Sequence, residues 1–361
     1  MIKLALLMAV FSLFPRPAQA FPELVRYGYV NCTSCHVSPS GGGVLTEYGR
    51  QLSAEALSTW STEDESAFLY KAVPTPQWLN IGGDLRAVEI YRNTPQVWAF
   101  RFLNMQEDLE LAGTYDKFTA DVSGGLYMGN FESRRYYLNY RPTDEISYRF
   151  GKFRQAYGLM EPDHTTPITR GLGWDEDTES YNFEAAWMGA NLNVILTANF
   201  GPMGSTVIPD EMKEKGLAAR VGVPFKENYL VGASYFHGVS ETANRDVAGP
   251  YAMLGFTHHS FLLSEFDFQS VNPSAMSNST GWVTWNRLDY EFMQGLHGYL
   301  TYQLTRPDFQ ASATQTSAYG IGSQWFPRPH FEFDLLWQRQ SEPAFPDDTL
   351  DYVVLLLHYY L

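Results

Sequence analysis

The sequence has little charge, few cysteines and no long apolar run, and each shortage excludes a class of protein. Charged residues make up 18% of the 361 residues, and the formal net charge is −15. So acidic a chain does not suit nucleic acid, which binds basic surfaces, or anionic lipid headgroups, which attract clusters of lysine and arginine. After residue 20 no stretch approaches about 18 consecutive apolar residues, so we expect no membrane-spanning helix.

Residues 1–20 have the features of a secretory signal peptide. Lys3 supplies a positive start, an apolar stretch covers residues 4–14, and Ala18-Gln19-Ala20 offers a cleavage site of small residues. We expect this segment to be removed on export. Because it contains two basic residues, Lys3 and Arg16, and no acidic one, the exported chain is still more acidic.

Aromatic residues and glycine are abundant. The chain contains 24 phenylalanines, 23 tyrosines and 29 glycines, and 16% of its residues are aromatic. Its length would ordinarily suggest about two domains, but it also suits one large barrel. Moderate hydropathy with many aromatic residues and no long apolar run is typical of an outer-membrane β-barrel.

From Gln77 onward apolar and polar residues alternate, which predicts β-strands with one apolar face. About sixteen strands of about ten residues are what a transmembrane antiparallel barrel requires, so we predict an all-β barrel over residues 77–361. The predicted strands are 77–91, 96–112, 116–128, 133–141, 144–153, 179–188, 190–200, 216–223, 227–238, 251–257, 260–270, 280–291, 296–305, 315–326, 330–340 and 351–361.

Proline positions and connection lengths support the barrel. All prolines after residue 20 fall outside the predicted strands, as a closed sheet requires. Short turns alternate with longer loops, which include 154–178, 201–215 and 239–250. We expect the short side to be periplasmic, and the longest loop, 154–178, can fold into the lumen. Polar strand positions predicted to face the lumen include Arg135, Arg149, Glu184, Glu265 and Asp267.

Cys32 and Cys35 are the only cysteines, and His36 follows them directly. C-x-x-C-H is the attachment pentapeptide of c-type haem. Two thiols at this spacing can form thioethers with the two vinyl groups of one porphyrin, and the adjacent histidine can bind its iron. We therefore predict one covalent haem c at Cys32 and Cys35, with His36 as an axial ligand of the iron.

Two other interpretations of the cysteines stay open. A redox disulfide would need a helix within a βαβ pattern, and none follows the motif. A zinc site would need two more ligands at metal-site spacing, and the nearest later histidine is His164. If the iron has a second axial ligand, candidate histidines are His164 in the longest loop and His258, His259 and His330 at predicted periplasmic turns. A methionine ligand would have to come from the barrel.

The motif lies in a segment of its own, residues 21–76, which ends at Pro74 and Pro76. Gly41-Gly42-Gly43 allow the backbone to pass close to a flat ligand without a Cβ clash. About 55 residues are few for an independent core. Either covalent haem supplies much of the missing apolar interior, or the segment packs inside something larger.

The signal peptide, the Cys32–His36 motif, the downstream Tyr48-Gly49-Arg50 and the barrel pattern together resemble the fused cytochrome–porin proteins of bacteria. The outer-membrane iron-oxidising cytochromes belong to this class, although residues 37–43 depart from their pattern. The resemblance implies a monohaem c-type cytochrome fused to an outer-membrane porin, surrounded by outer-membrane lipid. It would transfer electrons across or at the outer membrane, between a periplasmic redox carrier protein and an extracellular donor or acceptor such as iron.

Two functional alternatives remain beside this resemblance. One is a porin-like channel whose haem segment is a plug or sensor. The other is an enzyme that oxidises an extracellular metal, although an electron-transfer protein suits the sequence better than a classical enzyme. The chain has no phosphate loop and no H-E-x-x-H motif, so nucleotide-binding and metalloprotease functions have no support.

Overall fold

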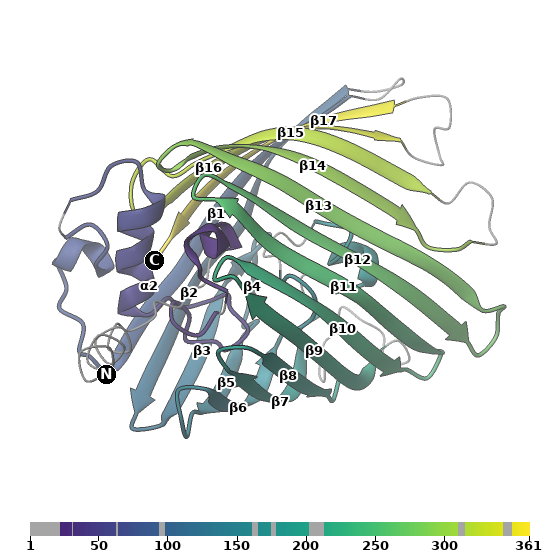
Figure 1. Ribbon diagram of the computed structural model, residues 1–361, viewed down its shortest axis with the longest axis horizontal. Helices are drawn as coiled ribbons and strands as arrows, with labels where there is room; N and C mark the ends of the chain where they lie inside the picture. Colours follow the sequence, from purple (N-terminus) through teal and green to yellow (C-terminus); the bar gives the residue numbers. More distant parts are fainter. Residues whose placement is uncertain are drawn as a thin grey trace, which may run out of the picture.

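The computed structural model describes residues 22–30, 32–62, 64–93, 98–160, 165–174, 178–201, 213–309, 315–341 and 349–361. These residues form one antiparallel sheet that closes on itself, because β1 pairs with both β2 and β17 (Figure 1). The sheet contains 17 strands by count, but β4 has three residues and pairs with β3, as β5 does. Since β4 and β5 share one place in the ring, the molecule is a closed 16-strand barrel, as the sequence predicts.

The strands are β1 (Leu79–Asn93), β2 (Trp98–Tyr115), β3 (Phe118–Tyr127), β4 (Asn130–Glu132), β5 (Tyr136–Tyr140), β6 (Ile146–Phe153), β7 (Ser180–Met188), β8 (Asn193–Asn199), β9 (Lys215–Phe225), β10 (Tyr229–Val239), β11 (Ala243–Thr257), β12 (Ser260–Pro273), β13 (Ser279–Met293), β14 (Leu296–Arg306), β15 (Thr316–Trp325), β16 (Phe331–Ser341) and β17 (Thr349–Tyr360). The helical segments are η1 (Pro22–Tyr27), α2 (Glu47–Leu52), η2 (Ser53–Leu57), η3 (Phe68–Lys71) and η4 (Arg170–Leu172). Among the described residues, no helix is long and apolar enough to span a membrane.

The two faces of the barrel wall differ in polarity. In β7 the buried side chains include Asn182 and Glu184, which face the lumen, while Phe183 and Trp187 are exposed on the outside. A polar lumen and an apolar, aromatic-rich exterior are the pattern of a barrel that stands in lipid. The apolar residues of the alternating pattern therefore form the membrane-facing exterior of the barrel, and they do not form a core like that of a soluble protein.

The prediction that every proline lies outside the strands is wrong. Pro224, Pro250 and Pro273 lie in β9, β11 and β12. Proline lacks the N–H that a sheet ladder uses, and the β11–β12 pairing breaks off after Ala248 and resumes at Tyr251. The sheet thus tolerates Pro250 by leaving out two ladder positions.

Pro250 also explains why the predicted loop over residues 239–250 is wrong. The sequence predicts a long loop over 239–250, because Pro250 signals the end of a strand. In the structure β11 begins at Ala243, and the connection from β10 is only residues 240–242. The strand thus extends well beyond the predicted 251–257.

Every second connection is short, and these lie at one end of the barrel, which we call the short-turn end; the short connection 240–242 lies at the opposite end. The connections at the short-turn end are residues 116–117, 141–145, 189–192, 226–228, 258–259, 294–295 and 326–330. The N-terminal segment contacts several of these turns: Thr59 Oγ1 donates to Gln294 O at 2.9 Å, and Trp60 N donates to Pro327 O at 3.1 Å. Figure 1 shows α2 beside the C-terminus at this end, where Ser53 Oγ lies 2.7 Å from the hydroxyl of Tyr360.

Candidate functional site

The Cys32–His36 motif folds into a single helical turn. His36 N donates to Cys32 O at 3.0 Å. Side chains three positions apart on such a turn lie on one face, so the thiols of Cys32 and Cys35 are arranged to reach one flat ligand. Cys35 is buried, and neither cysteine belongs to a disulfide among the described residues.

His36 is held by backbone on both sides. The residues on either side of His36 bond to the chain around Leu45, since Val37 N donates to Val44 O at 3.0 Å and Thr46 N donates to Cys35 O at 2.8 Å, and His36 Nδ1 lies 3.3 Å from Gly43 O. When Nδ1 donates to a carbonyl oxygen, the lone pair of the imidazole is on Nε2, which is the usual arrangement of a metal-binding histidine. The chemistry of this donor set, two thiols on one face and an adjacent oriented imidazole, fits a covalently attached haem.

The glycine run that follows the motif, residues 41–43, brings the backbone close to Cys32 and to the barrel wall. Gly41, Gly42 and Gly43 have φ angles of 83°, 72° and 68°, a left-handed conformation that favours glycine. A Cβ at Gly41 would lie 3.2 Å from Cys32 Sγ, and one at Gly43 would lie 2.7 Å from Glu110 Oε2 on β2. The run therefore lets the backbone pass between the first cysteine and the barrel wall.

Arg149 of β6 holds the chain that follows the motif. Its guanidinium donates to the hydroxyl oxygens of Ser38 and Ser40, at 2.7 Å each, and pairs with Glu184 of β7 at 2.9 Å. All four side chains are buried, and the guanidinium also lies 3.6 Å from the ring centre of Phe153. Because Arg149 and Glu184 face the lumen, these bonds place residues 38–40 inside the barrel.

A second ion pair lies beside the glycine run. Arg135 donates to Glu110 Oε2 at 2.6 Å, and its guanidinium lies 3.3 Å from the place of a Cβ on Gly42. We call the inner face of β2–β7, with Glu110, Arg135, Arg149 and Glu184, the polar wall. It supplies the directional contacts that position the loop after the motif.

Charged residues of the barrel wall influence the Cys32 thiol. Burial raises the pKa of the Cys32 thiol above its ordinary value, while the positive charge of Arg220 on β9 lowers it and the negative charge of Glu184 on β7 raises it. The thiol also lies against the glycine run, since a Cβ at Gly41 would be 3.2 Å from Cys32 Sγ.

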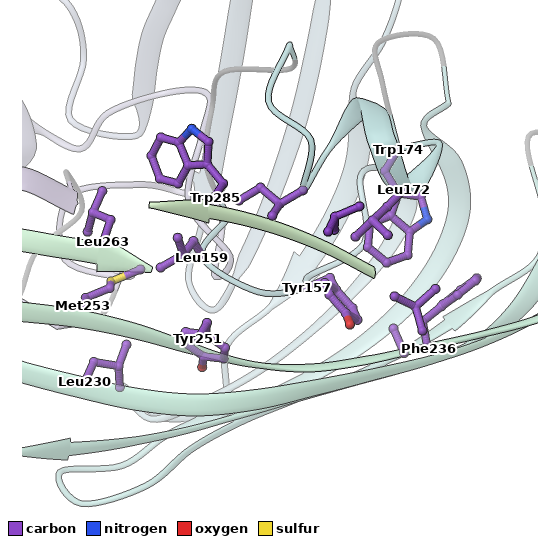
Figure 2. Packing of buried hydrophobic residues seen from close by; sticks show 14 of the residues in the cluster. Tyr157, Leu159, Leu172, Trp174, Leu230, Phe236, Tyr251, Met253, Leu263 and Trp285 are labelled. Carbon is purple, nitrogen blue, oxygen red and sulfur yellow. The ribbon is translucent and has the colours of Figure 1, made fainter. Parts of the chain in front are cut away.

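The inner face of β10–β13, which we call the apolar wall, is covered by the long loop after β6. Gly158 N donates to Ser234 Oγ at 3.0 Å, and Leu159 N donates to Glu265 Oε2 at 2.6 Å. Figure 2 shows the apolar side chains of this loop against those of the wall. The loop residues are Tyr157, Leu159, Ile168, Leu172 and Trp174, and the wall residues include Leu230, Phe236, Tyr251, Met253, Phe261, Leu263, Val283 and Trp285.

The structure thus bears out the expectation that this loop folds into the lumen. His164, the candidate ligand within it, lies outside the described residues. The apolar cluster also includes Val25 of the N-terminal segment, with Val30 packed against it. Two inserts, the Cys32–Leu45 loop and the 154–174 loop, therefore occupy the lumen together.

The other candidate histidine ligands lie at the short-turn end. His258 stacks on Tyr27 with ring centres 5.8 Å apart, and His259 is 59% exposed. The ring nitrogens of His330 lie 2.7 and 2.8 Å from the carbonyl oxygens of Tyr360 and Glu65. None of these three is placed by its contacts to bind iron in the lumen. Buried methionines that face the lumen are Met188 and Met253.

Among the described residues, no group of three or more His, Cys, Asp or Glu side chains could hold a metal ion. Within that part of the chain, the zinc alternative therefore gains no further ligands. A haem c requires less of the protein, because the porphyrin itself supplies four donors to the iron.

Gly49 joins α2 directly to the motif. A Cβ at this position would lie 2.5 Å from Cys35 O and 2.9 Å from Cys35 Cβ, so the helix backbone contacts the second cysteine. Arg50 is buried and donates to Leu45 O at 3.0 Å and to Ile81 O at 3.3 Å, which ties α2 to β1. The aromatic-Gly-Arg triplet is thus part of the same site as the cysteines.

Comparison with known proteins defines the fold. No family model and no curated protein matches the chain. OmpT, an outer-membrane protein of Vibrio cholerae, is similar with a TM-score of 0.64 and 10% identity over 78% of this chain and 99% of that one. The anion-selective porin from Comamonas acidovorans has a TM-score of 0.59 and 9% identity, with coverages of 78% and 99%. The DcaP channel of Acinetobacter baumannii has a TM-score of 0.58 and 10% identity, with coverages of 78% and 97%.

These likenesses establish a porin-type outer-membrane barrel as the fold. They agree with the outer-membrane location that the sequence predicts. At such low identity they say nothing about the lumen contents, so function has to be argued from the residues inside the barrel.

Proposed function

We propose that this protein is a monohaem c-type cytochrome fused to an outer-membrane porin-like barrel, which transfers electrons across or at the outer membrane. The observation that supports it most is the contact between the loop that follows the motif and the polar wall. Arg149 binds Ser38 and Ser40 from a buried lumen position. A segment that merely preceded the barrel would have no reason to be bound there.

The residues around the motif suit a redox centre. Bound haem would supply one-electron chemistry, with a potential that depends on its ligand, burial and nearby charge. Cys32 and Cys35 would hold it covalently, and His36 would bind its iron. Val37, Val44 and Ala112 form a buried apolar cluster beside His36, which keeps water from this side of the motif.

Two partners belong to the proposal. The short-turn end corresponds to the periplasmic side of outer-membrane barrels, so a periplasmic redox carrier protein would meet the N-terminal segment. The other partner is an extracellular electron donor or acceptor reached through the long-loop end, and iron is the one that the family resemblance names.

The second candidate function is a porin-like channel whose haem segment is a plug or sensor. The fold supports it, since two of the similar structures are described as an anion-selective porin and an outer-membrane channel. The two inserts in the lumen argue against free diffusion of solutes through the barrel. The plug alternative therefore requires that at least one insert move.

Reconstitution separates the two functions. The purified protein is placed in liposomes that hold a trapped electron acceptor, and a reductant that cannot cross the bilayer is added outside. Electron transfer predicts reduction of the trapped acceptor without leakage of small solutes, and loss of that reduction in a Cys32→Ala, Cys35→Ala variant. Solute flux without electron flux would instead establish the channel.

A further inference from the structure

The surface of the N-terminal segment contains one face that lies directly above the motif. Gly49 on the inner side of α2 contacts Cys35, as described above. On the outer side the exposed side chains are those of Glu47, Tyr48, Gln51 and Glu55. We call these four residues the α2 face; the first three belong to α2, whose backbone contacts Cys35 at Gly49, and Glu55 belongs to η2, which follows directly.

The α2 face is held in a fixed orientation. Thr46 caps the helix by accepting from Gly49 N at 3.1 Å, and its own hydroxyl donates to Ser34 O at 2.7 Å within the motif. On the barrel side, Gln294 Nε2 donates to Glu55 O at 2.8 Å. The face is therefore tied both to the motif and to a turn of the short-turn end.

The chemistry of the face is that of a transient docking surface. Glu47 and Glu55 are exposed, and the only basic residue of α2, Arg50, is buried against the barrel, so the face is negatively charged. Tyr48 belongs to the same face and is 42% exposed. Complexes of redox proteins are small, use aromatic residues at their centre and form quickly through complementary charge.

We propose that the α2 face docks the periplasmic redox carrier, and that this carrier is a soluble redox protein with a basic surface around its own cofactor. The proposal rests on the proposed electron-transfer function and names its periplasmic partner by charge. Since electron transfer slows steeply with distance, the face nearest Cys35 is where docking is productive.

The test is charge reversal with a control on the same side of the membrane. A small soluble c-type cytochrome of basic isoelectric point is the probe, and its electron exchange with the purified protein is followed by stopped flow at rising ionic strength. Glu47→Lys with Glu55→Lys should slow the second-order exchange about tenfold or more at low salt and flatten its salt dependence. Asp116→Lys with Asp144→Lys changes the charge equally on two other short turns and should have little effect.

The two double variants decide the proposal. It is overturned if Glu47→Lys with Glu55→Lys slows the probe no more than the control variant does. Reduction of each variant by a small uncharged reductant should be unchanged, which shows that the haem site is intact. An acidic cytochrome as probe should react slowly with the native protein and faster with the α2-face variant.

A binding measurement keeps this result separate from the proposed function. Binding of the basic cytochrome to the Cys32→Ala, Cys35→Ala variant, measured by calorimetry, should remain and should be lost on reversal of Glu47 and Glu55. If the native protein binds the probe through this face yet exchanges no electrons, the proposed function fails while the docking surface stands. If electrons exchange independently of the face, the docking surface fails alone.

Discussion

The two walls of the lumen hold their inserts by different means. The polar wall holds the loop after the motif through a few directed bonds, such as those from Arg149 to Ser38 and Ser40. The apolar wall holds the 154–174 loop by burial of large side chains such as Trp174, in addition to directed bonds such as those from Tyr157 to Asp267 and from Leu159 N to Glu265. Hydrogen bonds fix position and orientation, whereas apolar burial is non-directional and scales with area.

From this difference we infer that the two walls have separate roles inside one barrel. A redox centre needs its ligand and its surroundings at fixed positions, which suits the directed contacts of the polar wall. A loop that narrows the lumen needs only to stay in place, which suits the apolar wall. Changes to the polar wall should therefore alter haem properties, and changes to the apolar wall should alter permeability.

The largest effect is expected at His36. In His36→Ala the thioethers can form, but the iron loses its adjacent protein ligand, so the absorption spectrum should shift to a high-spin or externally ligated form. Electron transfer through the barrel should fall, while the gel mobility shift on boiling, which reports the closed barrel, should persist. His237→Ala, near the end of β10, is the control; equal spectra for His36→Ala and the native protein would remove His36 from the site.

Arg149→Ala tests the polar wall. Removal of the guanidinium leaves Glu184 buried without its partner, at a cost of about 3–5 kcal/mol, and releases Ser38 and Ser40. The loop after the motif should become susceptible to limited proteolysis, and the reduction potential should shift. Arg149→Lys should restore part of the protection, because it keeps the charge. Arg328→Ala, an exposed ion-pair residue, is the control, and full protection in Arg149→Ala would contradict the role of this wall.

Leu159→Ala tests the apolar wall. Truncation of this buried side chain should destabilise the packing of the 154–174 loop by about 2–5 kcal/mol. Ion conductance in planar bilayers should rise, while the haem spectrum should stay unchanged. Leu196→Ala, on the outer face of β8, removes the same atoms without affecting the lumen. A haem spectrum that changes as much as in Arg149→Ala would mean that the two walls act as one.

The smallest effect concerns the surroundings of the Cys32 thiol. In haem-free protein with Cys35→Ser, the raised pKa of Cys32 should make its alkylation at neutral pH slower than that of a free cysteine, with the rate increasing as the pH rises. The folded state favours the protonated thiol, so its contribution to stability is present below the unfolded pKa and is lost above it. Arg220→Gln should slow alkylation further, because the positive charge of Arg220 lowers the pKa of Cys32, and an unchanged rate would contradict that influence.

The barrel was largely predictable because each strand carries its own signal in the alternation of neighbouring residues. Alternating polarity along each strand reports which face meets lipid, and all sixteen predicted strands have counterparts in the structure. The failures are local too: Pro250 concealed the first half of β11, and the three residues of β4 lie in the predicted connection between strands 116–128 and 133–141. A rule against proline in strands cannot anticipate a ladder that omits two positions.

The arrangement of the site was less predictable because its contacts join distant residues. The pentapeptide identified Cys32, Cys35 and His36, but its surroundings could not be read from it. Arg149 is 111 positions from Ser38, and Arg149 was recognisable only as one lumen-facing charge among many. The role of Gly49 was equally hidden, since a close approach to Cys35 leaves no trace in local sequence pattern.

The presence of covalent haem on a barrel protein is the central claim, and it can be tested in one preparation. Outer membranes are solubilised, and the purified protein is analysed by denaturing gel with haem-peroxidase staining and by mass spectrometry of its peptides. We expect a stained band and one haem attached to the peptide that contains Cys32 and Cys35, both of which disappear in the Cys32→Ala, Cys35→Ala variant. Unmodified thiols in protein made by cells competent for c-type cytochrome maturation would contradict it.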